Sequence, residues 1–593
     1  MKVSDYVVDF ISRQGVNHVF EFIGGAITHL IDSIHHRSDM DCVSVHHEQT
    51  GAFAAEAYAR INGRLGVAMA TSGPGALNMV TGIGSCWFDS VPCLFITGQV
   101  NTYEYKFDRP VRQIGFQETD IVSVVDSLTK YAVLVTEPES IRYHLEKAVW
   151  LAQNGRPGPV LLDIPMNIQR AQIEPEALNC FWGSAEQAAL CDIEAPNPDS
   201  IEAVAALIGK AKRPVILAGG GIRTARAAEE LQSLVQQTGI PVVCTLMGLD
   251  VIPHDNRAFF GMIGAYGNRY GNMTLANADL LLILGARLDS RQTGTRPDTF
   301  ARAATKVHVD IDANELNAKV GVDLALRADV KEFLSALNRE LDGKPATDLT
   351  PWYQVIDGYR EKYSTHAAPG ESCGGIDPNR FMEMLSSRCG TGDVVCLDVG
   401  QNQIWAAQSF RLKKGQRMLN SGGMGAMGFS LPAALGAAKA LNGQRIIALA
   451  GDGGIQVNIQ DLDAIVNHSL PVKVIVLNNG CLGMVRQFQD LYFGGRRQST
   501  VIGYGCPNLI EIAKAYGLPT FSITNLEEAG SILDAALALE GPAYVEVALE
   551  QDSCVNPKLV VNRPIEDMSP HLDRQELADA MLIDLVDEGE VPQ

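Results

Sequence analysis

The sequence predicts an α/β protein made of three doubly wound parallel-sheet domains. Short runs rich in β-branched residues alternate with longer amphipathic segments throughout, which is typical of parallel strands joined by helical crossovers. The 593 residues exceed the roughly 100–200 residues that one domain usually holds. Apolar residues make up 46% and charged residues 20%, so each domain can fill a core, and a disordered or fibrous chain is excluded.

The first block of strand-like runs predicts a domain over residues 1–170. The helical pattern EQTGAFAAEAYARI lies between its first two runs. A polar, proline-containing stretch from about residue 170 to 198 ends the block. The predicted strands are 42–46, 66–70, 93–97 and 159–164.

Two further blocks predict a central domain over 195–342 and a third domain over 365–555, separated by the linker-like stretch DGKPATDLTP. The tail, 556–593, contains the acidic amphipathic helix pattern LDRQELADAMLIDLVDE, which we expect to pack or to form an interface. The predicted strands are 213–218, 241–245, 279–284 and 306–312 in the central domain, and 393–399, 445–450, 472–477 and 542–548 in the third.

The charge balance indicates which partners the chain can bind, and the cysteine pattern indicates its compartment. Lys and Arg number 48 against 69 Asp and Glu, a formal charge of −21, and no basic tract breaks this balance. Nucleic acid and anionic membranes are therefore poor partners. The start of the chain lacks a basic segment followed by an apolar one, and the apolar runs are only strand-sized. The 12 cysteines are scattered singly, which favours reduced thiols and a cytoplasmic location.

The most specific chemical signal is a pair of motifs in the third block. Gly451-Asp452-Gly453-Gly454 follows one predicted strand, and Asn478-Asn479 follows the next. One crossover separates them, so Asp452 and Asn479 are expected at the carboxyl ends of neighbouring parallel strands, where such sheets bind ligands. Carboxylate and amide oxygens suit magnesium, and glycines let backbone amides approach a diphosphate. A Gly-rich turn alone is often structural, but this pairing favours a metal–diphosphate site.

This spacing resembles the diphosphate-binding motif of thiamine-diphosphate (ThDP) enzymes, and a second match lies far away in the first block. His47-Glu48-Gln49 stands at the end of a predicted strand, directly before a helix. By the resemblance, Glu48 hydrogen-bonds N1′ of the aminopyrimidine and favours the tautomer that removes the C2 proton. On its own, Glu48 would be an acid stabilised by a helix dipole.

Further segments resemble the acetohydroxyacid (acetolactate) synthase branch of the ThDP family, over nearly the whole chain. They are Gly24-Gly25-Ala26, residues 71–75, 116–119, 155–159, 399–401 and 423–428. The resemblance implies that Glu48, Gln117 and Met427 are catalytic, Met427 by supporting the bent cofactor. It implies magnesium ligation by Asp452, Asn479 and the carbonyl of Cys481. The implied ThDP contacts are Gly24, Gly25, Pro74, Asn78, Val399, Gly400, Gln401, Asn402, Gly425, Gly451, Asp452, Gly453, Gly454, Asn479, Leu482, Gly483, Met484 and Val485.

A flavin site is implied in the central domain. The run Gly219-Gly220-Gly221 is a weak phosphate-loop signal by itself. Segments 285–291 and 308–312 add weight, since they resemble the FAD-binding part of acetohydroxyacid synthases. The alternative is a domain that binds nothing, or a bare nucleotide. The implied FAD contacts are Arg156, Gly219, Gly220, Gly221, Thr245, Leu246, Gly264, Ala265, Gly285, Arg287, Asp289, Arg291, Asp310, Ile311 and Asp329.

Four positions depart from the family pattern where the acceptor or the flavin is expected. The family's lysine after DIP is Met166, its tryptophan after GMV is Phe488, its flavin-loop methionine is Ala265, and the second aspartate of GARxDDR is Ser290. These changes predict a roomier and less cationic acceptor pocket. Arg291, which in the family contacts the acceptor carboxylate, is retained.

The leading hypothesis is a ThDP- and FAD-dependent carboligase that decarboxylates pyruvate and adds the two-carbon acyl-anion equivalent to a ketone. A nucleotide-linked keto-deoxysugar fits, because PIEDMSPHLDRQEL and the pocket departures look like branched-sugar carboligases such as that of yersiniose. The alternatives are an acetolactate synthase catalytic subunit with a 2-oxo acid acceptor, a flavoenzyme like pyruvate oxidase, and an inactive structural homologue. The resemblance further implies a homodimer or homotetramer with active sites between subunits.

Overall fold

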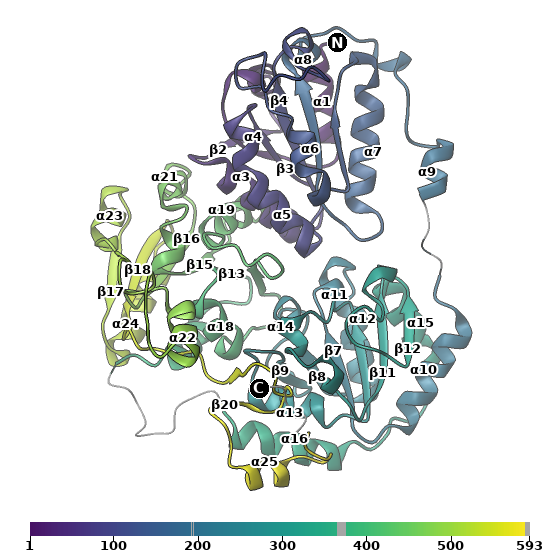
Figure 1. The fold of residues 1–593 in the computed structure, drawn as a ribbon, viewed down its shortest axis with the longest axis vertical. Coiled ribbons are helices and arrows are strands. Elements are labelled where there is room, and N and C mark those ends of the chain that lie inside the picture. The colour runs from purple at the N-terminus through teal and green to yellow at the C-terminus, as the bar shows by residue number, and fades with distance from the viewer. Residues whose placement is uncertain (191–192, 194, 365–374, 587–593) are drawn as a thin grey trace.

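Three parallel β-sheets organise the protein, which we describe from a computed structural model (Figure 1). The structure describes residues 1–190, 193, 195–364 and 375–586. Each of the three sheets has six strands. Neighbouring strands within a sheet run parallel, as in the pairs at the centre of each. Helices cover both faces, so the predicted fold of three doubly wound α/β units is confirmed.

The N-terminal sheet places helices α1 (Val3–Arg13), α2 (Thr28–His35) and α7 (Ile141–Gln153) on one face and α3 (Glu48–Asn62) and α5 (Val80–Asp89) on the other. Alternate residues of a strand enter the two cores: Val67 and Met69 face one, Ala68 and Ala70 the other. The strand order is β2 (Asp41–Ser44), β1 (His18–Phe22), β3 (Gly66–Ala70), β4 (Cys93–Gln99), β6 (Val160–Pro165) and β5 (Tyr131–Leu134).

The central sheet packs α10 (Pro198–Lys210), α12 (Ala228–Thr238) and α15 (Val330–Leu341) on one face, and α13 (Arg269–Ala276) and α16 (Thr350–Lys362) on the other. Its strand order is β12 (Leu324–Arg327), β11 (Thr305–Asp310), β10 (Leu280–Leu284), β7 (Pro214–Ala218), β8 (Val242–Cys244) and β9 (Phe259–Met262).

The third sheet shares its two cores with the other domains, because one apolar cluster joins it to the central sheet and another joins it to α3. Its strand order is β14 (Arg417–Asn420), β13 (Val394–Leu397), β15 (Ile446–Gly451), β16 (Val472–Asn478), β18 (Ala543–Ala548) and β17 (Thr520–Ile523). Its helices are α17 (Pro378–Arg388), α18 (Gln401–Ser409), α19 (Ser430–Ala440), α21 (Leu462–Asn467), α22 (Gly483–Tyr492), α23 (Leu509–Ala515) and α24 (Leu526–Ala538).

Every run that the sequence predicts as a strand is a strand, with ends shifted by about two residues at most. Six further strands of the three large sheets escaped the sequence pattern, as did the two short strands β19 (Lys558–Leu559) and β20 (Met568–Ser569) of the tail. The six are β1, β5, β9, β12, β14 and β17. Of these six strands, all but β1 lie at sheet edges, where a strand needs fewer apolar residues. β1 lies inside its sheet, but its sequence HVFEF is interrupted by the buried Glu21.

The tail packs against the central domain, and its helix is shorter than predicted (Figure 1). Helix α25 spans only Arg574–Ala580. The backbone N–H of Leu582 donates to the side-chain oxygen of Asn277 at 2.7 Å, and the Ala580 carbonyl accepts from Tyr359, so central-domain contacts replace further helical bonds. The last residues of the predicted pattern, 587–588, lie outside the described residues, as does residue 365, the predicted start of the third domain. The domain boundaries themselves stay predictions.

Within the described residues, no helix combines the length and apolar character that crossing a membrane would require.

Candidate functional site

The GDG and NN motifs meet at one corner of the third sheet. Strands β15 and β16 are neighbours, with Gly451 opposite Leu477, so Asp452 and Asn479 leave the sheet side by side. Asp452 opens the short helix α20 (Asp452–Ile455) and is 2% exposed. The hydroxyl of Tyr504 donates to its Oδ2 at 2.7 Å. Burial raises the pKa of the Asp452 carboxyl, so this carboxylate favours a neighbouring cation.

Three oxygen atoms face one another at this corner with no hydrogen-bonding proton between them: the side-chain oxygen of Asn479, Oδ1 of Asp452 and the carbonyl oxygen of Cys481. The side-chain oxygen of Asn479 lies 3.3 Å from Oδ1 of Asp452 and 3.0 Å from the Cys481 carbonyl oxygen. Rotating the amide would put its nitrogen there, but that nitrogen already donates to Oε1 of Gln401 at 3.0 Å. A cation between the oxygens relieves their repulsion, and carboxylate, amide and carbonyl oxygens are the ligands that magnesium takes. The predicted ligand set therefore fits magnesium.

The Asp452 corner differs from a zinc site in the type of its ligands, since zinc is usually bound by several His or Cys side chains. Among the described residues, no group of three or more His, Cys, Asp or Glu side chains is placed to hold a metal. The corner offers mixed oxygen ligands with a single carboxylate, the usual form of a magnesium site completed by a phosphate ligand.

Glycines bring the predicted diphosphate segments 399–402, 451–454 and 482–485 together. A Cβ added to Gly483 would lie 2.0 Å from Oε1 of Gln401, and one added to Gly453 would lie 2.5 Å from Leu482. The methyl group of Met427 would lie 3.5 Å from that same Gly453 position. Larger side chains cannot occupy these approaches. The structure therefore gathers the predicted ThDP contacts of the third domain around Asp452.

Asp398 organises this corner, and sequence reasoning missed it. Its carboxylate is 1% exposed and accepts hydrogen bonds from the backbone N–H groups of Val399, Gly428 and Ser430 at 2.9, 2.9 and 3.1 Å. It thereby links the end of β13 to the loop that carries Gly425 and Met427, both predicted site residues. Asp398 lies inside the predicted strand 393–399, whereas the observed strand β13 ends at Leu397, so the sequence pattern gave no signal for its role.

Glu48 belongs to a second group, in the N-terminal domain. It opens α3 behind the N-cap His47 and is 7% exposed. Nδ2 of Asn78, at the end of the short helix α4 (Pro74–Asn78), donates to its Oε2 at 2.9 Å. The predicted residues Gly24, Gly25 and Gln117 lie nearby, since Gly24 packs on Thr71, and the Gln117 backbone lies against Gly73.

The domains that carry the two groups are in contact with each other. Helix α3 packs on α19 so closely that a Cβ on Gly436 would lie 2.0 Å from the Ala54 carbonyl oxygen. The backbone N–H of His46 donates to Oδ1 of Asp461 at 2.7 Å. Within the described part of the chain, no hydrogen bond or ion pair joins Glu48 to Asp452 or Asn479.

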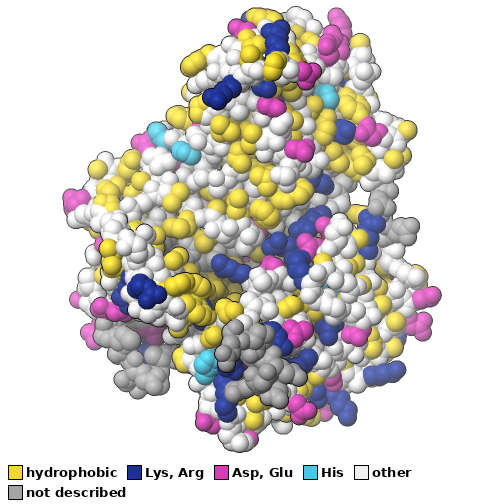
Figure 2. Space-filling view, in the orientation of Figure 1, with side chains coloured by type: hydrophobic (Ala, Val, Ile, Leu, Met, Phe, Trp, Pro, Cys, Tyr) yellow, Lys and Arg dark blue, Asp and Glu magenta, His cyan; other side chains and the backbone are white. Residues whose placement is uncertain are grey.

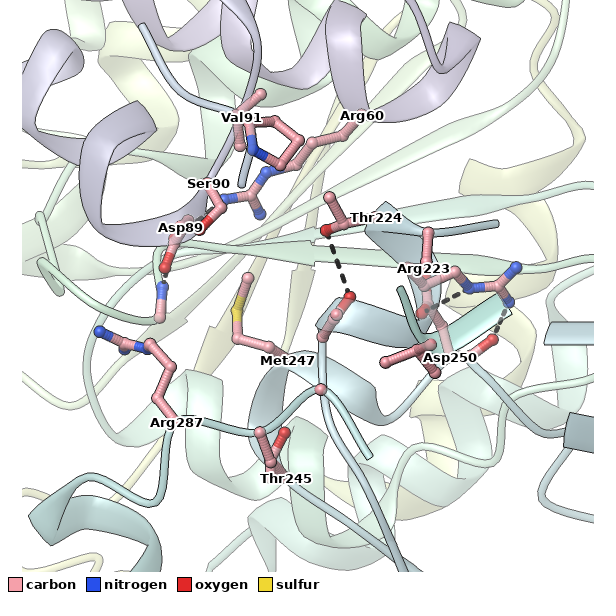
Figure 3. A pocket seen from close by; sticks show the side chains of 18 of the residues that line it. Arg60, Asp89, Ser90, Val91, Arg223, Thr224, Thr245, Met247, Asp250 and Arg287 are labelled. Atoms are coloured by element: carbon pink, nitrogen blue, oxygen red, sulfur yellow. Dashed lines mark hydrogen bonds and ion pairs between the residues drawn. The ribbon is translucent and has the colours of Figure 1, made fainter. Parts of the chain in front are cut away.

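A large cavity of about 1000 Å³ lies where the three domains meet (Figure 3). All the predicted FAD contacts line it except Gly219, Gly264 and Ala265. Gly219 and Gly264 shape its wall: a Cβ on Gly219 would lie 2.0 Å from the Gly285 carbonyl oxygen, and one on Gly264 would lie 2.3 Å from that of Arg291. Figure 2 shows Lys and Arg side chains gathered in the hollow where the N-terminal and central domains meet.

The charged groups of this cavity are partly paired with one another. Arg156 contacts Asp312 at 3.0 Å and Glu315 at 2.8 Å, whereas Arg223 is held by Asp250, as Figure 3 shows. Burial raises the pKa of the Asp310 carboxyl to about 6. Cationic groups and glycine backbones of this kind suit a diphosphate-containing ligand.

One wall of the cavity is tied to the loop that leads to Met427. Asp89 accepts hydrogen bonds from the backbone N–H groups of Gly422 at 2.9 Å and Gly423 at 2.7 Å. Arg60 pairs with Asp89 at 2.8 Å and donates to the Asn420 carbonyl at 2.7 Å. These buried contacts fix the start of the loop from the N-terminal domain.

A second, small cavity of about 160 Å³ collects three of the four departures from the family pattern. Ala265, Ser290 and Phe488 all line it. Met166 does not; it begins the short helix α8 (Met166–Gln169) of the N-terminal domain. Lys558, from the tail, lines the same cavity and was missed by sequence reasoning. Lys558 is thus a second cation close to Tyr266, in addition to the predicted Arg291. Nothing in the local sequence around Lys558 reveals its location.

Comparison with known proteins agrees with this architecture. Three family models match: the thiamine pyrophosphate enzyme N-terminal TPP binding domain over residues 1–124, the central domain over 201–337 and the C-terminal TPP binding domain over 398–547. Acetolactate synthase 2, chloroplastic, of Nicotiana tabacum is 37% identical over 94% of this chain and 83% of its own length. Acetolactate synthase isozyme 3 large subunit of Escherichia coli is 35% identical over 95% of this chain and 98% of its own length.

The matched regions contain the Asp452 corner and the Glu48 group, each in a TPP binding domain. Identity of this level over nearly the full length shows common descent as well as a common fold. The chain is therefore a thiamine-diphosphate-dependent enzyme of the acetolactate synthase family.

Proposed function

We propose that the chain is a ThDP-, magnesium- and FAD-dependent carboligase that takes pyruvate as donor and adds its two-carbon unit to a ketone. A nucleotide-linked keto-deoxysugar is the acceptor we favour, which would place the enzyme in branched-chain sugar biosynthesis. When bound, ThDP supplies the electron sink that lets a 2-oxo acid lose carbon dioxide. The names of the relatives support an acetolactate-type condensation of pyruvate.

The residues that would hold ThDP and magnesium are those of the two buried groups. Asp452, Asn479 and the Cys481 carbonyl would bind the metal, which offsets the charge of the diphosphate. The carboxyl of Glu48, held by Asn78, would exchange a proton with N1′ of the pyrimidine. The buried position of Glu48 limits access of water to this proton.

FAD in the large cavity is supported by its volume, by its glycine-lined loops and by its cations. A Cβ on Gly285 would lie 2.7 Å from the Cα of Gly221, so the two loops present bare backbone to the cavity. Arg287 lines it beside Asp289 at 3.3 Å. A carboligation is redox-neutral, so the flavin would serve as a structural group.

One observation carries the choice of a ketone acceptor: three of the four departures line a single cavity. Ala265 and Phe488 are smaller than the methionine and tryptophan expected from the resemblance, so space is left for a bulkier acceptor. The cavity adjoins α22, whose first residues, Gly483–Val485, are proposed to contact ThDP. Donor and acceptor sites would thus lie along one helix.

Mass-spectrometric product analysis tests this proposal. The enzyme is incubated with pyruvate, ThDP, magnesium, FAD and a mixed panel of ketones, keto-deoxysugar nucleotides and 2-oxobutyrate. The proposal requires a tertiary alcohol from a ketone as the main product, with slow acetolactate formation from pyruvate alone. Preference for 2-oxobutyrate over every ketone would refute the ketone assignment.

An acetolactate synthase catalytic subunit is the second candidate function, and one observation favours it. Arg291 and Lys558 lie within 5.8 and 5.9 Å of the Tyr266 ring, so two cations are available to a 2-oxo acid carboxylate. The pyruvate-oxidase-like alternative predicts oxygen consumption with pyruvate, which the same incubation can monitor.

We further propose a homodimer or homotetramer in which Glu48 of one chain serves the Asp452 corner of another. The resemblance implies this arrangement, and within the described part of one chain no hydrogen bond or ion pair joins the two groups. A cytoplasmic location is part of the proposal, supported by the described cysteines, all of which are free thiols.

A further inference from the structure

Lys558 is a buried cation that has no anionic partner among the described residues. The residue is 6% exposed. Its Nζ lies 5.2, 5.5 and 5.9 Å from the ring centres of Phe488, Tyr492 and Tyr266. Within the part of the chain that the structure describes, no oxygen accepts a hydrogen bond from this ammonium and no carboxylate pairs with it. An ammonium has three donors, and aromatic faces satisfy none of them as an oxygen would.

The described lining of the cavity provides no negative charge to pair with Lys558. No Asp or Glu is among the described residues that line it. The guanidinium of Arg291 lies 5.8 Å from the same Tyr266 ring, so a second cation is close by. Desolvation by burial lowers the pKa of Lys558, so its surroundings disfavour the charged form. A bound anion would reverse that effect, because it would pair with the ammonium.

The backbone holds Lys558 in place. It belongs to the two-residue strand β19 (Lys558–Leu559), which pairs with β20 (Met568–Ser569). The next N–H, of Leu559, donates to the Ala265 carbonyl at 2.7 Å, and the N–H of Asn562 donates to Oγ1 of Thr295 at 2.8 Å. The ammonium is thereby presented to the cavity from a fixed position, as binding sites require.

Helix α22 links the small cavity to the proposed ThDP site. Phe488 lies on α22 one turn after Val485, a proposed ThDP contact, and both side chains are solvent-accessible on that helix. Figure 2 shows apolar side chains gathered on this part of the surface. An acceptor whose carbonyl approaches the ThDP site can therefore extend along α22 toward Lys558.

We propose that Lys558 is a specificity-determining residue that binds an anionic oxygen group of the acceptor, either a carboxylate or a phosphate. The inference rests on the proposed carboligase function and names a charge requirement of its acceptor. The aromatic rings hold the apolar part of the acceptor, and the ammonium donates hydrogen bonds to its anionic end. The tail thus supplies a cation that the Met166 position lacks.

Matched acceptor pairs test this inference, with pyruvate as donor and the full-length enzyme. One pair is 2-oxobutyrate and 2-butanone, which differ by a carboxylate. The other is dihydroxyacetone phosphate and dihydroxyacetone, which differ by a phosphate. For each pair, the ratio of the two products is measured in competition for the unaltered enzyme, Lys558→Met, Lys558→Arg and the exposed control Lys514→Met.

Lys558→Met should lower the anionic-to-neutral product ratio roughly tenfold or more in at least one pair, because a charge-assisted hydrogen bond is lost. The pair that responds identifies carboxylate or phosphate as the natural group. Lys558→Arg should retain most of the ratio, and Lys514→Met should leave it unchanged. Thermal melting checks that Lys558→Met is folded, and Lys558→Gln replaces it if it is not.

Ratios within twofold of the unaltered enzyme in both pairs would overturn the role of Lys558 while leaving the carboligase function intact. Absence of any ligation product from the unaltered enzyme would overturn the proposed function and this inference together, so the two failures are distinguishable.

Discussion

Asn78 donates from Nδ2 to Oε2 of Glu48 at 2.9 Å, and this hydrogen bond orients the one carboxyl group proposed to act on the pyrimidine of ThDP. Glu48→Gln should lower the rate of C2 hydrogen–deuterium exchange in bound ThDP by roughly 10²–10⁴-fold, since an amide cannot share a proton with N1′. NMR after acid quench measures the exchange. ThDP titration serves as the control for binding, and near-normal exchange in the variant would remove Glu48 from its role.

On the proposed magnesium assignment, Asp452→Ala should abolish ThDP binding at limiting magnesium, because the metal site would lose the one carboxylate in its proposed ligand set. Isothermal titration of ThDP at graded magnesium concentrations is the measurement. Asp463→Ala, at an exposed position in α21, is the matched control and should bind normally. Equal ThDP affinity of the two variants at low magnesium would contradict the metal site.

Mixing the two inactive proteins Glu48→Gln and Asp452→Ala should restore activity after subunit exchange. If each site combines the N-terminal domain of one chain with the third domain of another, mixed dimers contain one site with both residues intact. About a quarter of normal activity is expected from random mixing of equal amounts, because half of the dimers are mixed and each has one intact site of two. Native mass spectrometry confirms the exchange, and persistent inactivity of verified mixed dimers would favour sites within one chain.

On the proposed flavin assignment, affinity for FAD should fall as the pH drops through about 6, because burial raises the pKa of Asp310 to about 6. Above that pH the carboxylate is ionised and can accept hydrogen bonds from flavin hydroxyl groups, whereas protonation below it weakens that acceptance. Flavin fluorescence after gel filtration at pH 5 to 8 follows the release. Asp310→Asn should bind FAD more weakly at pH 8 and flatten the profile, and an unchanged profile would exclude Asp310 as the cause.

The raised pKa of Asp310 also has a consequence for stability without flavin. Since the folded-state pKa lies above the unfolded value of about 3.9, the native state binds more protons between those values. The contribution of Asp310 to stability is therefore fully present below about pH 4 and is lost as the pH rises through 6. Melting temperatures of flavin-free Asp310→Asn and unaltered protein should converge at low pH and differ most above pH 6, with the variant favoured.

Phe488→Trp should shift acceptor preference toward 2-oxobutyrate and away from bulky ketones, because the indole fills part of a cavity of only about 160 Å³. Product ratios in competition with pyruvate as donor measure the shift. Leu539→Trp, at an exposed position just beyond the end of α24, is the control and should leave the ratio unchanged. Adding Met166→Lys tests whether a cation from the N-terminal domain reaches the same acceptor; no additional shift would place Met166 outside the acceptor site.

Local pattern was sufficient to predict the buried strands and the motifs at their ends. Asp452 and Asn479 could be paired from sequence because parallel neighbours bring strand ends together. Edge strands such as β12 and β17 were missed because half-exposed residues leave no apolar run. Asp398 and Lys558 were missed for a different reason: their importance comes from backbone amides and rings that are distant in sequence, which no local spacing encodes.

The pairing of Asp89 with the amides of Gly422 and Gly423 means that the large cavity and Met427 lie at opposite ends of one short loop. On the proposed flavin assignment, a nucleotide bound in that cavity would hold this loop in one conformation. An enzyme of this design would retain a redox cofactor through evolution although it transfers no electron, because losing the flavin would misalign the carbon–carbon bond-forming site. Reduced and oxidised flavin should then support the reaction equally well.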